Sequence, residues 1–236
     1  MFLFILPVGP LISIIRQAMN TVVIDYGSGN LRSVGKALEK AAAGLNIETS
    51  IIVTKQASAL STADRIVLPG VGAFGDCSKG LGSIPGMLDA LEHSVKEQKK
   101  PFLGICVGMQ LLANYGLENG RHKGLGWIPG EVQPIKPREP ELKIPHMGWN
   151  VVHVPKNSKH PILSRFPRGA HAYFVHSYFF SCKNAHDVLA TVDYGHHFPA
   201  IIGRENIIGT QFHPEKSQIT GLYLLGEFLK WNGDKG

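Results

Sequence analysis

From residue 20 onward, segments whose hydrophobic positions have the pattern of strands alternate with segments that have the pattern of helices. Short apolar runs rich in valine and isoleucine have the length of buried strands, and amphipathic stretches with helical spacing lie between them. The predicted strands are 21–27, 47–54, 65–70, 101–105, 172–182, 188–195 and 207–212. The predicted helices are 31–43, 84–99, 107–116 and 221–231. Strands that alternate with helices in this way indicate βαβ units.

The pattern changes over residues 120–200, where glycine and proline are frequent and strand-like runs follow one another. We therefore expect an α/β protein with some antiparallel strands, built on an open mixed, mostly parallel sheet flanked by helices. No internal repeat, low-complexity segment or linker divides the sequence. Residues 19–236 are accordingly predicted to form one domain.

The first 18 residues, MFLFILPVGPLISIIRQA, are strongly apolar but are interrupted by Pro7, Gly9 and Pro10. A membrane span needs about 20 apolar residues, and a secretory signal normally begins with basic residues. Neither pattern fits. We interpret residues 1–18 as an N-terminal extension with a misassigned start, because an ordinary strand follows Met19 directly. A genuine membrane or partner anchor is the alternative.

The cysteine content and the charge limit the compartment and the partners that the sequence suggests. The three cysteines, at 77, 106 and 182, form no CxxC pair, which favours a reducing compartment and hence the cytoplasm. The net charge of +6 comes from scattered Lys and Arg, without a basic stripe or a nucleic-acid-binding motif. We therefore expect no nucleic-acid partner, although the charge suits docking to an acidic protein.

One cysteine stands where a predicted strand meets a predicted helix. Cys106 is the centre of GICVG at 104–108, the thiol counterpart of the Gly-x-Ser-x-Gly nucleophile elbow. Flanking glycines allow the sharp turn, and the start of the helix directs N–H groups and a positive dipole end at the sulfur. The N–H of Val107 is placed to stabilise an oxyanion. Cys77 and Cys182 are interpreted as structural.

A thiol nucleophile requires a base and a group that orients the base. Of the 11 histidines, His213 in GTQFHPEKS is the best candidate, because a predicted strand ends there and Pro214 stops it. Active sites in open α/β sheets gather at the carboxyl ends of strands. Glu215, two residues further on, can be presented to the same place. Spacing alone leaves this assignment open.

Several segments together carry a family resemblance. GICVGMQ and QFHPEKS resemble class I (triad) glutamine amidotransferases, which hydrolyse the glutamine side-chain amide through a cysteine thioester. Within that family, DYGSGNLRSVGKALE, LPGVGAFGDC, GLGWIPGEV, KIPHMGWN and YFVHSYF are similar to the glutaminase subunits of imidazole glycerol phosphate synthases of histidine biosynthesis. The similarity extends from about residue 20 to about residue 229 and implies the amidotransferase fold.

The resemblance implies a role for each matched position. Cys106 would attack the carboxamide, His213 would carry the proton to departing ammonia, and Glu215 would orient the imidazole. The PGVG segment at 69–72 would supply an oxyanion N–H from Val71 or Gly72 beside that of Val107, and its two glycines would let the peptide reorient as an activity switch. Four positions match the surroundings of bound glutamine: Gln110, His176, Ser177 and Tyr178. Ordinary packing is the alternative for these four.

The resemblance also implies a partner, a separate (β/α)₈ cyclase subunit that receives the ammonia, in a heterodimer. The implied docking residues are Asn30, Arg32, Met147, Trp149, Asn150 and Lys216. No cofactor and no metal are expected, since the histidines and cysteines lack ligand spacing. Two alternatives stay open, a glutaminase that serves another synthase and a catalytically silent scaffold that only binds the cyclase.

Overall fold

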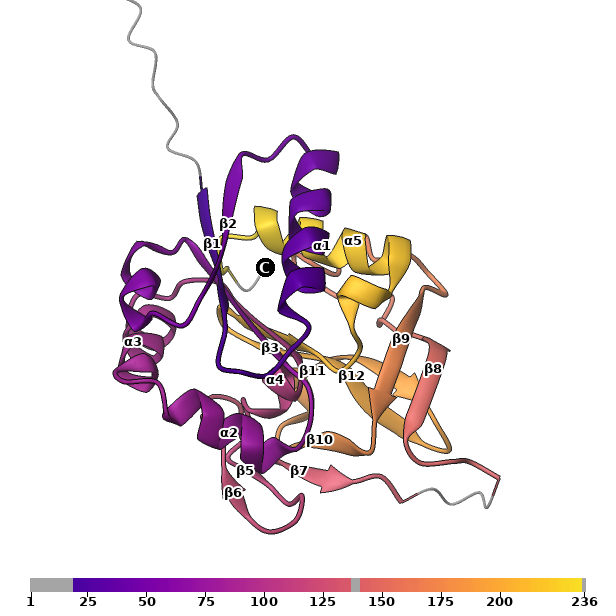
Figure 1. Ribbon diagram of the computed structural model, residues 1–236. Coiled ribbons are helices and arrows are strands. Elements are labelled where there is room, and N and C mark those ends of the chain that lie inside the picture. Colours follow the sequence, from indigo (N-terminus) through magenta and orange to yellow (C-terminus); the bar gives the residue numbers. More distant parts are fainter. Residues whose placement is uncertain (1–18, 137–140, 235–236) are drawn as a thin grey trace, which may run out of the picture.

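The computed structural model describes residues 19–136 and 141–234 and centres on a seven-stranded sheet (Figure 1). The strand order is β11-β12-β13-β4-β3-β1-β2. The strands are β1 (Met19–Ile24), β2 (Thr49–Thr54), β3 (Arg65–Gly70), β4 (Phe102–Cys106), β11 (Val188–Asp193), β12 (His197–Arg204) and β13 (Ile207–Thr210). Pairs from β13 to β2 are parallel, and β11-β12 and β12-β13 are antiparallel. The mixed, mostly parallel α/β sheet expected from the sequence is confirmed.

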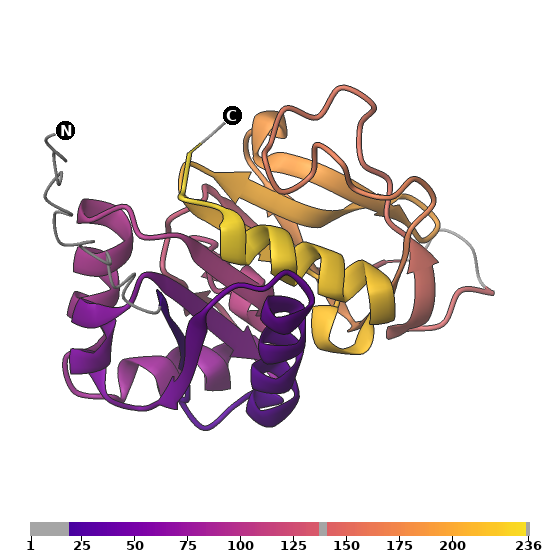
Figure 2. The same cartoon turned by 90° about the horizontal axis from the view of Figure 1, so that it is seen from above.

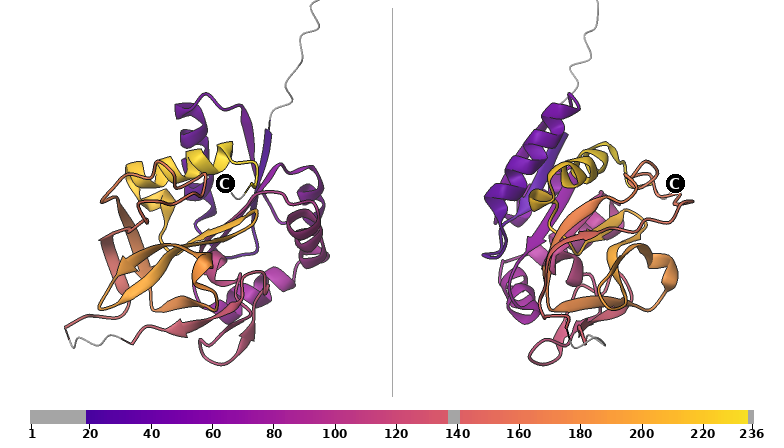
Figure 3. Two further views of the ribbon diagram at one scale, coloured as in Figure 1. Left: turned by 180° about the vertical axis from the view of Figure 1, so that it is seen from behind. Right: turned by 90° about the vertical axis from the view of Figure 1, so that its right-hand side faces the viewer.

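Helices cover both faces of this sheet. The helices α1 (Leu31–Gly44) and α5 (Gln218–Lys230) lie side by side on one face (Figures 2 and 3). On the other face lie α2 (Phe74–Gly82), α3 (Met87–Leu91) and a π-helical turn η2 (Glu92–Glu97). Every residue of β3 and β4 is buried, as a parallel strand covered on both faces requires.

Two smaller sheets lie beside the carboxyl ends of the central strands. One has the order β10-β7-β5-β6 and the other pairs β8 with β9. The strands are β5 (Tyr115–Gly116), β6 (His122–Lys123), β7 (Gly130–Pro134), β8 (His146–Val151), β9 (His171–His176) and β10 (Tyr178–Cys182). The β8–β9 hairpin packs next to α5, with a 3₁₀ turn η4 (Pro214–Lys216) between them (Figure 1).

One helix prediction is wrong in length. The helix predicted over 107–116 is only α4 (Val107–Gln110). The backbone carbonyls of Leu111 and Leu112 accept the N–H groups of Leu125 and Ile128 rather than those of a following helical turn. Tertiary hydrogen bonds therefore override a periodic apolar pattern that favours a longer helix.

Several elements were not anticipated, among them β5 to β8, α2 and β12. The helix α2 contains three glycines and has no capping side chain at Ala73; its first N–H, that of Phe74, is instead donated to Glu118 Oε2 at 2.7 Å. The strand β12 contains Pro199 and is held between its antiparallel neighbours. The start of α2 therefore depends on a residue remote in sequence, whereas β12 pairs with the strands that directly precede and follow it in the chain.

The extension at 1–18, with its predicted misassigned start, lies outside the described residues. Among the helices that the structure describes, none combines the length and apolar character needed to span a membrane.

Candidate active site

The strand β4 ends at Cys106 and α4 begins at the next residue, so the cysteine stands on the sharp corner expected for a nucleophile elbow. Its backbone has φ 54° and ψ −111°, in a region that residues with a side chain rarely adopt. Backbone strain of this kind costs on the order of 1–3 kcal/mol and persists where the surroundings impose it. Only 4% of Cys106 is exposed.

The flanking glycines are required by close backbone contacts. A Cβ at Gly108 would lie 1.8 Å from the carbonyl oxygen of Leu68, and a Cβ at Gly104 would lie 2.6 Å from that of Gly108. The short helix is therefore pressed directly against β3. This approach fixes the direction in which the Cys106 side chain leaves the corner.

Substitution of Gly108 by alanine is expected to lower the free energy of unfolding by about 3 kcal/mol, because backbone must move to admit the methyl group. Urea unfolding followed by circular dichroism measures this change. Gly44→Ala is the matched control, since nothing lies within 4 Å of its Cβ position, and it should change stability by less than about 1 kcal/mol. Equal unfolding midpoints for the two variants would contradict the steric argument.

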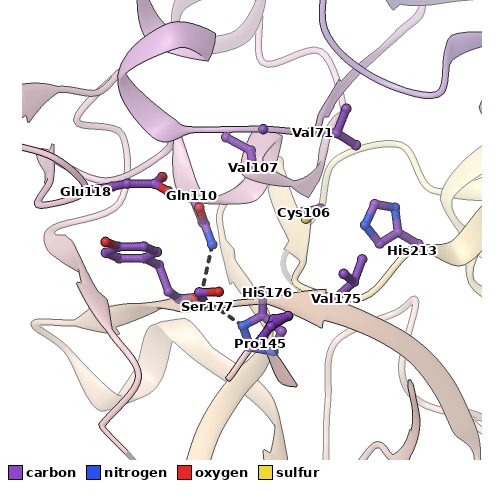
Figure 4. A pocket seen from close by; sticks show the side chains of 12 residues that line it. Val71, Cys106, Val107, Gln110, Glu118, Pro145, Val175, His176, Ser177 and His213 are labelled. Atoms are coloured by element: carbon purple, nitrogen blue, oxygen red, sulfur yellow. Dashed lines mark hydrogen bonds between the residues drawn. The ribbon is translucent and has the colours of Figure 1, made fainter. Parts of the chain in front are cut away.

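The structure places His213 beside this thiol (Figure 4). His213 follows β13, which pairs in parallel with β4, so the two residues reach the same edge of the sheet. Its Nδ1–H donates to Glu215 Oε1 at 2.9 Å, and both side chains are almost fully buried. Its Nε2 is buried without a hydrogen bond of ordinary geometry. The imidazole thus presents this atom to the site.

Electrostatics favour a protonated imidazole at this position. Burial lowers the pKa of His213, but polar and charge interactions with Cys106 and Glu215 outweigh it and raise the pKa to about 10. A charged imidazole next to a sulfur is the usual arrangement of thiol nucleophiles. The three residues can therefore provide a nucleophile, an acid and base, and an orienting carboxylate.

A pocket of about 300 Å³ opens in front of Cys106 (Figure 4). Its walls come from the end of β3, the elbow, and the turn between β9 and β10. The lining residues are Val71, Gly72, Cys106, Val107, Gln110, Glu118, Pro145, Val175, His176, Ser177, Tyr178 and His213. All the residues that the sequence suggested for oxyanion stabilisation and glutamine binding therefore border one cavity, which has the size of a small-molecule site.

One of these residues, Val71, differs from the expected arrangement. The N–H of Val71 donates to Ser28 Oγ at 3.2 Å, and the Ser28 hydroxyl in turn donates to the Val71 carbonyl. The Val71 amide is therefore engaged outside the cavity. Val107 opens α4, where the first N–H groups have no partner within the helix. Gly72, at φ 100°, has room around it for the peptide to turn.

Replacement of Ser28 by alanine should raise the rate of glutamine hydrolysis by the chain alone about tenfold. The variant releases the Val71 amide, and one added oxyanion donor is worth roughly 10²–10³ in rate when fully aligned. Ammonia release without any partner protein measures the effect. Ser61→Ala, which removes an exposed hydroxyl bonded to Ser58, is the control. A rate that stays the same or falls would argue against restraint by Ser28.

His176 contributes differently from the other lining residues, because both its ring nitrogens are engaged within the protein. Nδ1 bonds the Tyr178 carbonyl at 2.8 Å, and Nε2 bonds His146 Nδ1 at 2.9 Å. Its ring therefore has no free nitrogen for a ligand. Burial is the main cause that lowers the pKa of His176 to about 3 and that of His146 to about 4.

Acidification should destabilise the fold between pH 6.5 and about 4. Burial also lowers the pKa of His160 to about 4, so in this window the unfolded chain takes up protons that His146, His160 and His176 cannot bind when folded. The raised pKa of His213 adds no slope here, because it is protonated in both states below pH 6.5. Urea unfolding midpoints at pH 7 and 4.5 test this, and equal midpoints would contradict it.

The residues suggested for docking lie on two neighbouring parts of the surface. On β8, Met147 and Trp149 are 62% and 48% exposed. The Trp149 ring contacts Tyr173 edge-on at 6.0 Å, and Lys216 Nζ lies 5.7 Å from the centre of the Tyr173 ring. We call Met147, Trp149, Tyr173 and Lys216 the β8 patch.

The other three suggested docking residues, Asn30, Arg32 and Asn150, are not part of the β8 patch. Asn30 and Arg32 stand at the start of α1, which packs against η4. Asn150 donates from Nδ2 to the Asp193 carbonyl at 2.8 Å, so its amide is engaged within the chain.

Sequence reasoning missed three residues that the structure brings to the site: Ser28, Glu118 and His146. Glu118 brings a carboxylate into the pocket, with Oε2 bound to the Phe74 N–H. It lies 12 positions after the nucleophile, in a segment without a distinctive pattern. Ser28 and His146 lie within the segments DYGSGNLRSVGKALE and KIPHMGWN, which carry the family resemblance but assign no role to either residue.

Comparisons with known proteins agree with this geometry. The family described as glutamine amidotransferase class-I matches residues 22–229. A crystal structure of a glutamine amidotransferase aligns with a TM-score of 0.65 at 20% identity, covering 89% of this chain and 99% of that one, which shows a shared fold. The chain belongs to the class I glutamine amidotransferases.

More specific relatives are found within that class. The imidazole glycerol phosphate synthase subunit HisH of Brucella suis biovar 1 (strain 1330) is 55% identical over 216 residues, which cover 90% of this chain and 99% of the relative. The subunit of the same name from Rhodospirillum rubrum is 54% identical over 213 residues, with the same coverage. Among the class I enzymes, the chain is a member of this HisH group.

Proposed function

We propose that the chain is the glutaminase subunit of an imidazole glycerol phosphate synthase. It hydrolyses glutamine through a Cys106 thioester and delivers ammonia to a separate (β/α)₈ cyclase subunit, which forms imidazole glycerol phosphate and aminoimidazole carboxamide ribonucleotide. The observation that carries the proposal is the buried His213–Glu215 pair beside a cysteine held at positive φ. The likeness to HisH subunits supports the choice of synthase.

The reaction proceeds in two stages at the same three residues. The Cys106 thiolate adds to the glutamine amide carbon, the oxyanion forms near the Val107 N–H, and His213 donates a proton to the nitrogen that leaves as ammonia. His213 then takes a proton from water, which attacks the thioester and releases glutamate and the thiolate. Glu215 keeps the imidazole in the tautomer and orientation that both stages need.

The far wall of the pocket suits the amino acid end of glutamine. Glu118 brings a carboxylate, and Gln110 uses its amide nitrogen for hydrogen bonds to the Tyr178 carbonyl at 3.1 Å and to Gln211 Oε1 at 3.0 Å. Figure 4 shows the Gln110 side chain at this wall. Both residues therefore offer oxygen acceptors to the cavity. A positively charged α-ammonium group is the natural complement of this pair.

The cyclase subunit docks on the β8 patch. An aromatic and a methionine side chain, exposed together beside a lysine, have the composition of an interface core with a polar rim. Asn30 and Arg32 extend this surface from the start of α1. The patch adjoins η4, which carries Glu215, so the docked subunit lies close to the site that produces ammonia.

The deciding experiment measures ammonia release from glutamine by the full chain, with and without the cyclase and its ribonucleotide substrate. We expect slow release by the chain alone and a rise of at least 100-fold in the complete mixture, because the Val71 amide is engaged outside the pocket in the free chain. A chain that co-purifies with a different synthase and not with the cyclase would point to the other glutaminase. Glutamine-dependent synthesis that does not require this chain's thiol would point to a scaffold.

A further inference from the structure

A chain of buried hydrogen bonds connects β8 with the pocket. His146 on β8 and His176 on β9 are directly opposed in the register of the two strands, and His146 Nδ1 lies 2.9 Å from His176 Nε2. The exposed fractions are only 2% and 6%. The His146 ring is stacked between Phe174 and Tyr194, with ring centres 4.8 and 4.1 Å away, which fixes its plane.

The Tyr178 carbonyl, at the end of this series of hydrogen bonds, determines which atom is the donor in each of them. The Tyr178 carbonyl can only accept, so His176 Nδ1 must carry the hydrogen. Because burial keeps both rings neutral at pH 7, His176 Nε2 then accepts from His146 Nδ1–H. His146 Nε2 in turn accepts from Asn150 Nδ2 at 3.2 Å. Both imidazoles are therefore Nδ1–H tautomers.

The same carbonyl determines what the pocket wall presents to a ligand. The Tyr178 oxygen also accepts from Gln110 Nε2 at 3.1 Å, and the second hydrogen of that amide is donated to Gln211 Oε1 at 3.0 Å. With both hydrogens used, Gln110 has only its oxygen left for the cavity. Gln211 Nε2 lies 3.8 Å from Cys106 Sγ, so the network ends next to the nucleophile.

We propose that His146 is a positioning residue for glutamine binding, which acts through His176 and the Tyr178 carbonyl to hold the Gln110 amide with its oxygen facing the substrate ammonium. This inference rests on the proposed function, because it assigns His146 to the binding of the same substrate. Loss of the His146 donor frees the His176 ring to turn or change tautomer. The carbonyl and the Gln110 amide then lose their fixed orientation.

The kinetic test compares two substitutions of His146 in the full chain with its cyclase. His146→Leu removes the donor and is expected to raise KM for glutamine about tenfold, with kcat changed less than about threefold. His146→Asn places an N–H near the position of Nδ1 and should keep KM within about threefold of the unaltered chain. His160→Leu is the matched control, a half-buried histidine packed on Trp231 outside this network, and should leave KM unchanged.

The outcomes separate this inference from the function on which it rests. An unaltered chain that releases no ammonia from glutamine would refute the proposed function. An active chain in which His146→Leu keeps the normal KM, or loses kcat and KM together like a general folding defect, would overturn the role of His146.

Nitrogen-15 NMR of the imidazoles in the unaltered chain gives a readout that does not depend on any variant folding. We expect both His146 and His176 to be protonated at Nδ1 only. Protonation of either ring at Nε2 would overturn the proposal, because the bond directions that fix Gln110 would be reversed.

Discussion

Cys106→Ala should abolish glutamine-dependent ammonia release, with a fall in kcat on the order of 10⁵-fold or more. The thioester cannot form without the sulfur, and without the thioester water has no activated carbonyl carbon to attack in the pocket. The alanine keeps the Cβ and the backbone of the corner, so the fold and the β8 patch remain. Synthesis by the complex from added ammonium salts should therefore persist at the level of the unaltered complex.

The matched control for this variant is Cys182→Ala. Cys182 is a free, half-buried cysteine at the end of β10, and burial raises the pKa of its thiol to about 12, so it has little thiolate at neutral pH. Its loss should leave ammonia release within about twofold of normal. Glutamine-dependent synthesis that survives Cys106→Ala would assign the chain to the silent scaffolds and end the thioester mechanism.

Glu215→Gln is expected to lower kcat for glutamine hydrolysis by about 10²–10⁴-fold, with a smaller change in KM. The substitution removes a buried negative charge that helps to hold the pKa of His213 near 10. The new amide can also turn its N–H toward Nδ1, which forces the hydrogen of the imidazole onto Nε2. A ring in that tautomer cannot accept a proton from the thiol.

The pH profile separates this effect from a loss of structure. Because the pKa of His213 falls in Glu215→Gln, the residual activity should decline at a lower pH on the alkaline side than that of the unaltered enzyme. Glu97→Gln, which alters an exposed carboxylate paired with His93, is the control and should show the normal rate and profile. An unshifted alkaline limb in Glu215→Gln would contradict the electrostatic role of the carboxylate.

Local patterns were sufficient for the parallel strands of the central sheet. The strands β1, β3 and β4 are short runs of apolar residues that are covered on both faces, so their sequence reports their position directly. The helix α1 has buried residues at Val34, Leu38 and Ala42, the spacing of an amphipathic helix. The formation of these elements can be predicted from the residues within each segment and from their burial alone.

Several of the features that escaped prediction depend on contacts between distant segments. The helix α2 begins with an N–H held by Glu118, 44 positions away. The apparent helix after Gln110 gives its carbonyls to the segment around Leu125. Ser28 matters because the loop before α1 reaches Val71 across the sheet edge, and His146 because β8 places it opposite His176. A motif can locate Cys106 and His213, but not the groups that restrain the walls around them.

The exposed β8 patch also bears on how the chain behaves when it is made without its proposed partner. Met147 and Trp149 project from a two-stranded sheet, and a large apolar pair at such an edge invites self-association. A cell that makes this chain in excess would contain unassembled copies that tend to self-associate. Matched synthesis of the two subunits would therefore protect solubility as well as supply the pathway.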